Sequence, residues 1–206
     1  MAALFPMFLK LEGRTCVVVG AGNIAAQKLE SLLESGAEVR VVAPDANDAI
    51  RELARSARVT WIQAEFQPQH LQNASLVVAA TGKPAVNKAV HRAAQERGIF
   101  CNSVDEPEHC DFFYPAVVRR GDLQIAISTA GKSPALAQRI RKELEEQFDA
   151  SYGSWLNWLG DARERLFKRR IDPELRRRML HRIAGPALFE CFKSSREQNR
   201  PGVRRG

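Results

Sequence analysis

Short apolar runs alternate with amphipathic stretches over the first half of the chain. The runs lie at 17–19, 39–42, 59–62, 76–80 and 99–104, and apolar residues recur at helical spacing at 23–35, 47–58 and 85–97. Uninterrupted β-branched runs are typical of buried parallel strands. Regular alternation of such strands with helices is typical of a doubly wound parallel sheet, so this half predicts an α/β fold.

The pattern changes after residue 112. Two strand-like segments at 116–119 and 123–127 flank a turn at 120–122, which predicts a hairpin. Ser133 and Pro134 are a helix N-cap and first helical residue, so a helix is expected from 134 to about 147. Helical signals fill 150–193, with a fresh start at Asp172-Pro173. We therefore expect a sheet domain at 1–112, a hairpin and helix at 113–149, a small all-α domain at 150–193 and a disordered basic tail at 194–206.

A glycine motif follows the first strand. Gly20, Gly22 and Ala25 form the pattern G-x-G-x-x-A. In Rossmann-like sheets the first glycine permits a tight turn, the second lets a pyrophosphate approach the backbone, and the small third residue lets the helix pack closely. The motif predicts a dinucleotide-binding Rossmann-like domain, although a glycine turn between any strand and helix has the same pattern. The candidate cofactor-binding residues are Gly20, Gly22, Asn23, Ile24, Ala25, Pro44, Asp45 and Thr81.

Asp45 decides which dinucleotide is expected. It lies about twenty residues past the glycine motif, where an acidic residue normally holds the adenosine ribose 2′-hydroxyl. Arg40 lies inside the second strand and not at its end, so no arginine is expected to receive a 2′-phosphate there. The sequence favours NAD over NADP. Thr81, after the fourth strand, is a second contact expected at the carboxyl edge.

Charge is concentrated in the last quarter of the chain. The formal net charge is +7, with 17 basic and 18 acidic residues in 1–150 against 14 and 6 in 151–206. Such an excess suits nucleic acid, a membrane surface, an acidic small molecule or simply a solvated helix face. Nucleic acid is disfavoured because no aromatic residues interleave with Arg176 to Arg182. No apolar run approaches a membrane span, and four cysteines without a C-x-x-C pair indicate a reducing, cytoplasmic setting.

Two tempting motifs do not carry their usual chemistry. Gly131-Lys132-Ser133 resembles the end of a P-loop, but Ala126 occupies the position of its first glycine. His109, Cys110 and Asp111 are possible metal ligands, but adjacent residues rarely point at one ion and no partner pair at ligand spacing exists elsewhere. We expect neither a nucleoside triphosphate site nor a dedicated metal site.

Several segments together resemble the siroheme synthase dehydrogenase and chelatase family, that is, precorrin-2 dehydrogenase/sirohydrochlorin ferrochelatase. They span roughly the first 150 residues. Gln27 departs from the family's pattern, because an arginine is common at this position. The segments are Phe5 to Leu11, Val19 to Ala25 with Lys28, Asn102 to Asp105, Phe112 to Val118 and Ile127 to Pro134.

The resemblance implies oxidation of precorrin-2 to sirohydrochlorin with NAD as hydride acceptor. It also implies a homodimer paired through 113–149 and, in bifunctional members, insertion of ferrous iron, which would be a substrate and not a bound cofactor. The segments that resemble the family include none from the methyltransferase module that some relatives carry, so we expect uroporphyrinogen methylation to be done by another protein. A regulatory NAD-sensing module is the alternative, but such a protein would need a second ligand-binding βαβ domain.

The family's key carboxylate corresponds to Asp105, which we expect to act as a general base; an ordinary helix N-cap or turn aspartate is the structural alternative. The residues expected to bind the substrate are Asn102, Ser128, Thr129, Gly131, Lys132 and Ser133. For the 128–133 loop, a helix-capping turn is the alternative.

Overall fold

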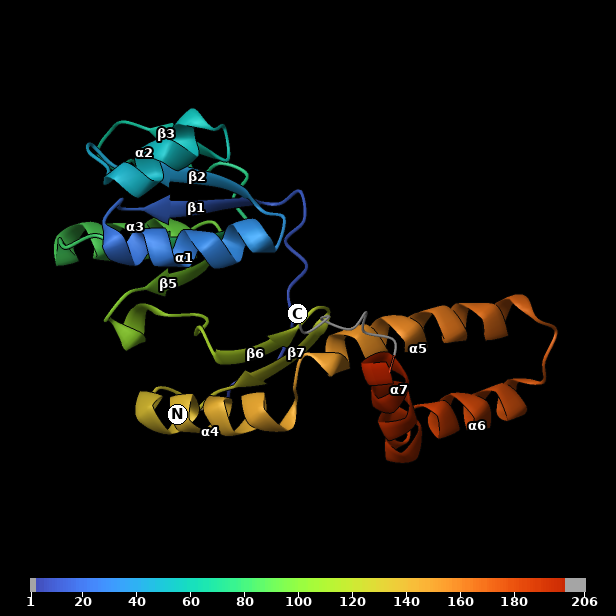
Figure 1. Ribbon diagram of the computed structural model, residues 1–206. Coiled ribbons are helices and arrows are strands. Elements are labelled where there is room, and N and C mark those ends of the chain that lie inside the picture. The colour runs from blue at the N-terminus through green and yellow to red at the C-terminus, as the bar shows by residue number, and fades with distance from the viewer. Residues whose placement is uncertain (1–2, 199–206) are drawn as a thin grey trace, which may run out of the picture. The chain divides into compact units, whose positions relative to one another are not determined.

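The computed structural model describes residues 3–198. The chain divides into two compact units between Tyr114 and Pro115. The first unit is a five-stranded parallel sheet with helices on both faces (Figure 1). Its strands are β1 (Thr15–Val19), β2 (Glu38–Val42), β3 (Val59–Ile62), β4 (Leu76–Ala79) and β5 (Phe100–Ser103). Its helices are α1 (Asn23–Glu34), α2 (Asp48–Arg55) and α3 (Pro84–Gln95), with 3₁₀ turns η1 (Pro68–Leu71) and η2 (Pro107–His109).

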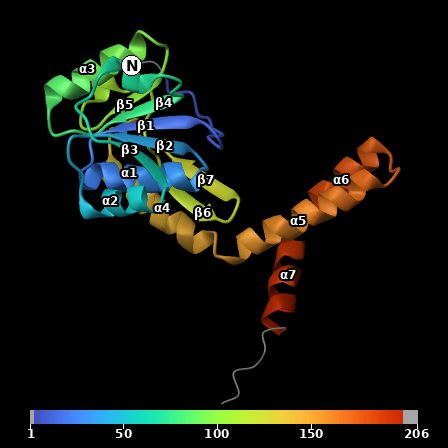
Figure 2. The same ribbon diagram turned by 90° about the horizontal axis from the view of Figure 1, so that it is seen from above.

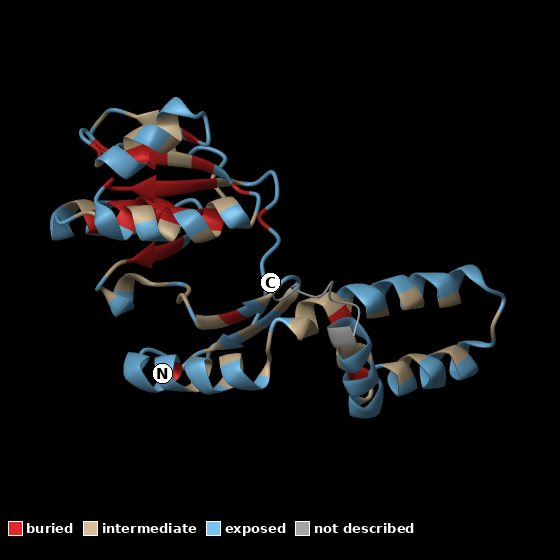
Figure 3. Cartoon of the chain, in the orientation of Figure 1, coloured by how far each residue is buried: buried red, intermediate tan, exposed pale blue. Residues whose placement is uncertain are grey.

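The sheet is buried on both faces because successive side chains of a strand point to opposite sides. Val18 packs with α1 and α2 through Leu29 and Ile50, while Val17 packs with α3 through Val90. Figure 2 shows α3 on one face of the sheet and α1 and α2 on the other, and Figure 3 shows the central strands as buried. This two-faced core explains the uninterrupted apolar runs at 17–19 and 76–80 and confirms the predicted doubly wound sheet.

The strand order is β3-β2-β1-β4-β5, with every neighbouring pair parallel. After β1 the chain moves outward to β2 and β3, then crosses back to place β4 on the other side of β1. The order therefore reverses between β1 and β4. In open α/β sheets, ligands bind outside the carboxyl ends of the strands at such a reversal. The segments that follow β1 and β4 lie at this edge.

The second unit begins with the predicted hairpin. Strands β6 (Ala116–Arg120) and β7 (Leu123–Ile127) pair antiparallel. Helix α4 (Pro134–Gln147) packs on the hairpin, and Ser133 Oγ caps it by accepting from the Leu136 amide at 3.2 Å, as the sequence predicts. The helices α5 (Ser151–Lys168), α6 (Pro173–Ile183) and α7 (Pro186–Gln198) follow.

The basic helices bury little. Trp155 on α5 and Phe189 on α7 are the buried aromatic residues, with ring centroids 4.7 Å apart, whereas α6 contributes no buried residue (Figure 3). Asp172 caps α6 as predicted by accepting from the Glu174 and Leu175 amides. Four of the arginines behind the local positive charge, Arg176, Arg177, Arg178 and Arg182, lie on this helix.

One prediction about the C-terminus is wrong in part. The segment 194–198, expected to be disordered, continues α7 to Gln198. Phe189 and Phe192 lie earlier on the same helix and contact the α5 side chains Trp155 and Trp158. This packing stabilises the start of α7, and the polar residues after it continue the helix. The rest of the expected disordered tail, 199–206, lies outside the described residues. Among residues 3–198, no helix is long and apolar enough to span a membrane.

Candidate active site

The turn out of β1 brings two backbones together. Gly20 has φ of +107°, and a Cβ placed on it would lie 2.3 Å from the Ala80 carbonyl oxygen. Only glycine tolerates both the dihedral angle and this approach. Gly20 N–H also donates to the Val42 carbonyl at 2.9 Å. The first glycine of the motif therefore fixes the ends of β1, β2 and β4 relative to one another.

Gly22 lies at the start of α1, where no side chain caps the first backbone amides of the helix. It is the N-cap, with extended backbone and no side chain to cap the helix. A Cβ placed on it would meet no described atom within 4 Å. Asn23 and Ile24 are exposed, whereas Ala25 is fully buried against the sheet. Uncapped amides, the positive end of the helix dipole and open space suit a pyrophosphate, so these residues fit a dinucleotide.

The corner after β2 differs from the sequence expectation. Asp45 lies there with its side chain 81% exposed, directly after Pro44. Its Oδ1 accepts from the Ala46 amide at 2.9 Å and pairs with Arg51 Nη2 at 2.5 Å. The expectation that no arginine occupies this strand end was wrong, because Arg51 reaches it from the first turn of α2. The argument from a missing arginine therefore fails, whereas Asp45 still lies where an acidic residue would hold the ribose 2′-hydroxyl.

Thr81 follows β4 at the same edge and is half-buried. Its hydroxyl donates to Asn87 Oδ1 at 2.6 Å and accepts from the Lys83 amide at 3.2 Å. Asn87 is buried in α3. The hydroxyl thus shapes the turn between β4 and α3, and a contact with the cofactor stays a prediction.

Asp105 stands just beyond the carboxyl end of β5. It is exposed and has φ of +63°, in the left-handed region that aspartate tolerates better than most residues. Within residues 3–198 its carboxylate has no hydrogen bond or ion pair. Non-glycine residues in this region cluster at functional sites, because the surrounding structure must hold them there. Asp105 is not a helix N-cap, but it lies in the turn that follows β5. Its action as a general base therefore stays a prediction.

The Lys28 ammonium interacts electrostatically with the Asp105 carboxylate. It lies on α1, one turn after Ala25, with its Nζ 4.1 Å from the centre of the Tyr114 ring. Burial lowers the pKa of the Lys28 ammonium, and the Asp105 charge opposes that shift. The sequence singled out Lys28 only as part of a matching segment. Its role beside Asp105 depends on a contact between α1 and the chain after β5, which helical periodicity alone does not reveal.

The residues around η2 form a hydrogen-bonded cluster. Glu106 Oε2 lies 2.8 Å from Ser103 Oγ, which donates to it, and 3.1 Å from His109 Nδ1. These bonds lower the pKa of the Glu106 carboxyl, the His109 bond contributing most. The His109 ring in turn packs on His91 of α3, with centroids 4.7 Å apart. The cluster holds the turn that presents Asp105.

The side chains of His109, Cys110 and Asp111 point to different partners. Cys110 Sγ donates to the Ser103 carbonyl at 3.1 Å, and Asp111 Oδ2 accepts from the Cys101 amide at 2.8 Å. No group of three or more His, Cys, Asp or Glu side chains in the described part of the chain could hold a metal ion. Asn102 also bonds within the unit, because its side-chain amide donates to the Phe112 carbonyl at 2.8 Å.

The loop expected to bind substrate lies in the second unit. Its hydroxyls accept from their own backbone: Ser128 Oγ from the Ala130 amide at 3.1 Å and Thr129 Oγ1 from the Ser133 amide at 3.3 Å. Gly131 has φ of +77°, and Lys132 is exposed. The geometry is that of a capping turn that presents a lysine, so substrate binding by this loop stays a prediction.

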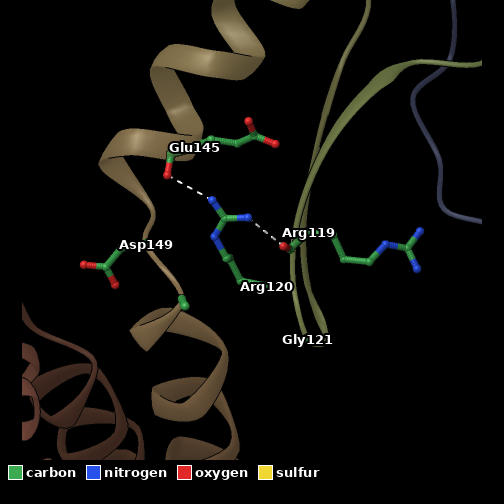
Figure 4. A pocket seen from close by; sticks show the side chains of 6 residues that line it. Arg119, Arg120, Gly121, Glu145 and Asp149 are labelled. Carbon is green, nitrogen blue, oxygen red and sulfur yellow. Dashed lines mark hydrogen bonds between the residues drawn. The ribbon is translucent and has the colours of Figure 1, made fainter.

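An open cavity of about 540 Å³ lies beside this unit's hairpin, lined by Arg119, Arg120, Gly121, Glu145, Asp149 and Ala150 (Figure 4). Arg120 points toward the end of α4 and donates to the carbonyls of Glu145 and Phe148 at 2.9 and 2.6 Å. Arg119 extends away from it (Figure 4). Arg120 caps the C-terminal end of α4 through these bonds. We therefore do not assign a second site to this cavity.

Two family models match the chain. The model described as "Putative NAD(P)-binding" matches residues 7–116, and the model described as "Sirohaem biosynthesis protein central" matches residues 120–147. The first covers more than half of the chain. The two matches follow one another in the order of the two structural units.

Named relatives agree with these models. The chain is 37% identical over 180 residues to siroheme synthase 3 of Aeromonas hydrophila, covering 87% of this chain and 38% of that protein. It is 39% identical over 172 residues to the siroheme synthase of Photorhabdus laumondii, covering 84% and 37%. The chain thus spans about two fifths of the length of these relatives. Among solved structures, "SirC, precorrin-2 dehydrogenase" is similar with a TM-score of 0.78 and 27% identity, over 95% of this chain and 100% of that one.

Proposed function

The chain belongs to the siroheme biosynthesis family of NAD(P)-binding proteins, and from this membership we propose that it oxidises precorrin-2 to sirohydrochlorin with NAD as hydride acceptor. The similarity to SirC, a precorrin-2 dehydrogenase, over nearly the whole chain supports this activity. The one observation that carries it is the unpaired carboxylate of Asp105, held in a left-handed backbone at the ligand-binding edge of the sheet.

The first unit supplies the cofactor site. The open amides after Gly22 bind the pyrophosphate, and the corner at Asp45 receives the adenosine ribose. When bound, the nicotinamide accepts the hydride that leaves the reduced macrocycle. The protein's own contribution is to orient both partners and to remove a proton.

Asp105 is the residue we assign to that proton transfer. A general base must be ionised and within reach of the substrate. Asp105 is exposed, so a substrate can reach its carboxylate. Ser103, Glu106 and His109 are positioning residues, because their hydrogen bonds fix the turn on which Asp105 stands.

The substrate and the assembly involve the second unit in this proposal. Precorrin-2 carries eight carboxylates, so exposed cations such as Lys132 are suited to bind it. We also propose a homodimer that pairs through residues 113–149, a region that contains the match to the sirohaem central model. Insertion of ferrous iron is a further step for the same carboxylate, supported by the name siroheme synthase of the relatives. Iron is then a substrate.

The test is anaerobic incubation of the pure protein with enzymatically made precorrin-2 and NAD, followed by sirohydrochlorin absorbance. Product that forms only with NAD supports the dehydrogenase. Ferrous iron is then added, and siroheme formation faster than in the protein-free control supports chelation. Bound NAD without any product contradicts the catalytic proposal and favours an NAD-sensing module.

A further inference from the structure

A carboxylate and a guanidinium share the corner where the adenosine ribose of a dinucleotide would lie. Asp45 Oδ1 and Arg51 Nη2 are 2.5 Å apart. An acidic residue alone at this position binds the ribose hydroxyls and repels a 2′-phosphate, whereas an arginine nearby accommodates that phosphate. The chain has both groups in contact, which is neither of the two simple arrangements.

Arg51 is held at this corner by contacts other than Asp45. Its Nε donates to the Ala46 carbonyl at 2.7 Å, and its guanidinium carbon lies 5.7 Å from the centre of the Trp61 ring. Trp61 is fixed in turn, because its Nε1 donates to the Ala43 carbonyl at 3.0 Å. The guanidinium would therefore stay in place if Asp45 turned away, and its side chain is still 39% exposed.

The same corner is tied to the glycine loop. The Asn47 amide donates to the Ala21 carbonyl at 3.0 Å, and the Asn47 side chain donates to Asn23 Oδ1 at 3.1 Å. A nucleotide whose phosphates lie on the first turn of α1 thus has its ribose beside residues 45–51. If a dinucleotide binds at the glycine loop, this connection places the Asp45–Arg51 pair beside it.

We propose that Arg51 determines cofactor selectivity and makes the chain accept NADP as well as NAD. The proposal rests on the dinucleotide binding proposed above. Arg51 neutralises the carboxylate that would repel a 2′-phosphate, and a guanidinium has five N–H donors, of which the structure commits two. The remaining donors would make charge-assisted hydrogen bonds to a 2′-phosphate.

The experiment compares ADP-ribose with 2′-phospho-ADP-ribose by isothermal titration calorimetry on the full chain, so no catalytic activity is needed. The wild type is expected to bind both ligands within about tenfold of each other. Arg51→Gln is expected to weaken the 2′-phosphorylated ligand about tenfold or more, since a charge-assisted hydrogen bond is lost, and to change ADP-ribose by less than about threefold. Asp45→Asn is expected to strengthen the 2′-phosphorylated ligand.

Two control variants test whether these changes in affinity are specific to the Arg51 guanidinium. Arg55→Gln changes an arginine one turn further along α2 that pairs only with exposed Glu52 among the described contacts, and it should leave both affinities unchanged. Arg51→Lys keeps the charge and should retain part of the 2′-phosphate affinity, while thermal unfolding checks that each variant folds.

The proposal is overturned if the wild type rejects the 2′-phosphorylated ligand more than a hundredfold, or if Arg51→Gln weakens both ligands equally. A wild type that binds neither ligand overturns dinucleotide binding itself. Binding of both ligands without turnover of precorrin-2 leaves Arg51 selectivity supported and contradicts only the catalytic proposal.

Discussion

The Asn47 side chain joins the start of α2 to the start of α1. Its Nδ2 donates to Asn23 Oδ1 at 3.1 Å, while its Oδ1 caps α2 by accepting from the Ile50 amide at 3.0 Å. One residue therefore stabilises a helix and fixes the corner beside the glycine loop. The two effects can be separated by experiment.

Asn47→Ala is expected to lower the free energy of unfolding by about 1 kcal/mol, because the helix loses its cap. It should also weaken NAD binding severalfold, since the loop at Asn23 loses its support. Urea unfolding and calorimetric titration measure the two effects. Asp172→Ala, which removes the cap of α6 in the other unit, is the matched control and should cost similar stability with unchanged NAD affinity. Equal NAD affinity in both variants would contradict the link to the glycine loop.

Gly20 and Gly22 should fail in different ways when each is changed to alanine. At Gly20 the new Cβ would lie 2.3 Å from the Ala80 carbonyl oxygen, so the sheet itself must shift. We expect Gly20→Ala to unfold at a much lower temperature or to be insoluble. At Gly22 the Cβ meets no described atom, and the variant should fold with a loss of about 1 kcal/mol from the poorer N-cap.

Gly22→Ala should nevertheless bind NAD at least about tenfold more weakly, because its Cβ occupies the space where a pyrophosphate approaches the backbone. Thermal unfolding and NAD titration on both variants check this pair. Normal NAD affinity in a folded Gly22→Ala protein would show that the phosphates do not lie on α1.

The sequence predicts the sheet and the caps well, because both follow from local chemistry. The apolar runs give the five strands, and Ser133-Pro134 and Asp172-Pro173 give the starts of α4 and α6.

The sequence does not predict which side chains meet across elements. Arg51 lies on α2 in the helical pattern, and only the fold shows that its guanidinium returns to Asp45. The positive φ of Asp105 and its proximity to Lys28 are likewise tertiary features. In the 128–133 loop, Ser128 and Thr129 accept hydrogen bonds from their own backbone, as in the capping-turn alternative. Substrate binding by this loop stays a prediction.

Asp105→Asn should abolish most dehydrogenation while leaving the site intact. Asparagine tolerates the left-handed region and has nearly the same shape, so the backbone at φ of +63° is preserved. Loss of a general base lowers kcat about 10²-fold to 10⁴-fold. NAD affinity should stay unchanged.

The measurement is the rate of sirohydrochlorin formation at saturating NAD, across a pH series. Glu108→Gln removes an exposed carboxylate three residues away and is the matched control, with activity expected near that of the wild type. Full activity in Asp105→Asn would contradict its assignment as the base.

Asp149 links the end of α4 to α7. Its Oδ2 accepts from Lys193 Nζ at 2.8 Å, and its Oδ1 accepts from both the backbone amide and the hydroxyl of Ser151. The bond to Lys193 and then those to Ser151 lower the pKa of the Asp149 carboxyl to about 2.

The carboxyl of Asp149 should make the second unit sensitive to acid. Because its pKa is lower in the folded chain than the value of about 3.9 in an unfolded one, it stabilises the fold above about pH 4, and this contribution is lost as the pH falls toward 2. With the side chain 46% exposed, solvent screening limits the contribution to about 1 kcal/mol. Urea unfolding at pH 2 to 6, followed by fluorescence of Trp155 and Trp158 on α5, should show this loss in the wild type. Asp149→Asn should remove it, whereas Asp122→Asn, in the exposed hairpin turn, should not. An unchanged pH profile in Asp149→Asn would mean that Lys193 does not hold α7 through this carboxylate.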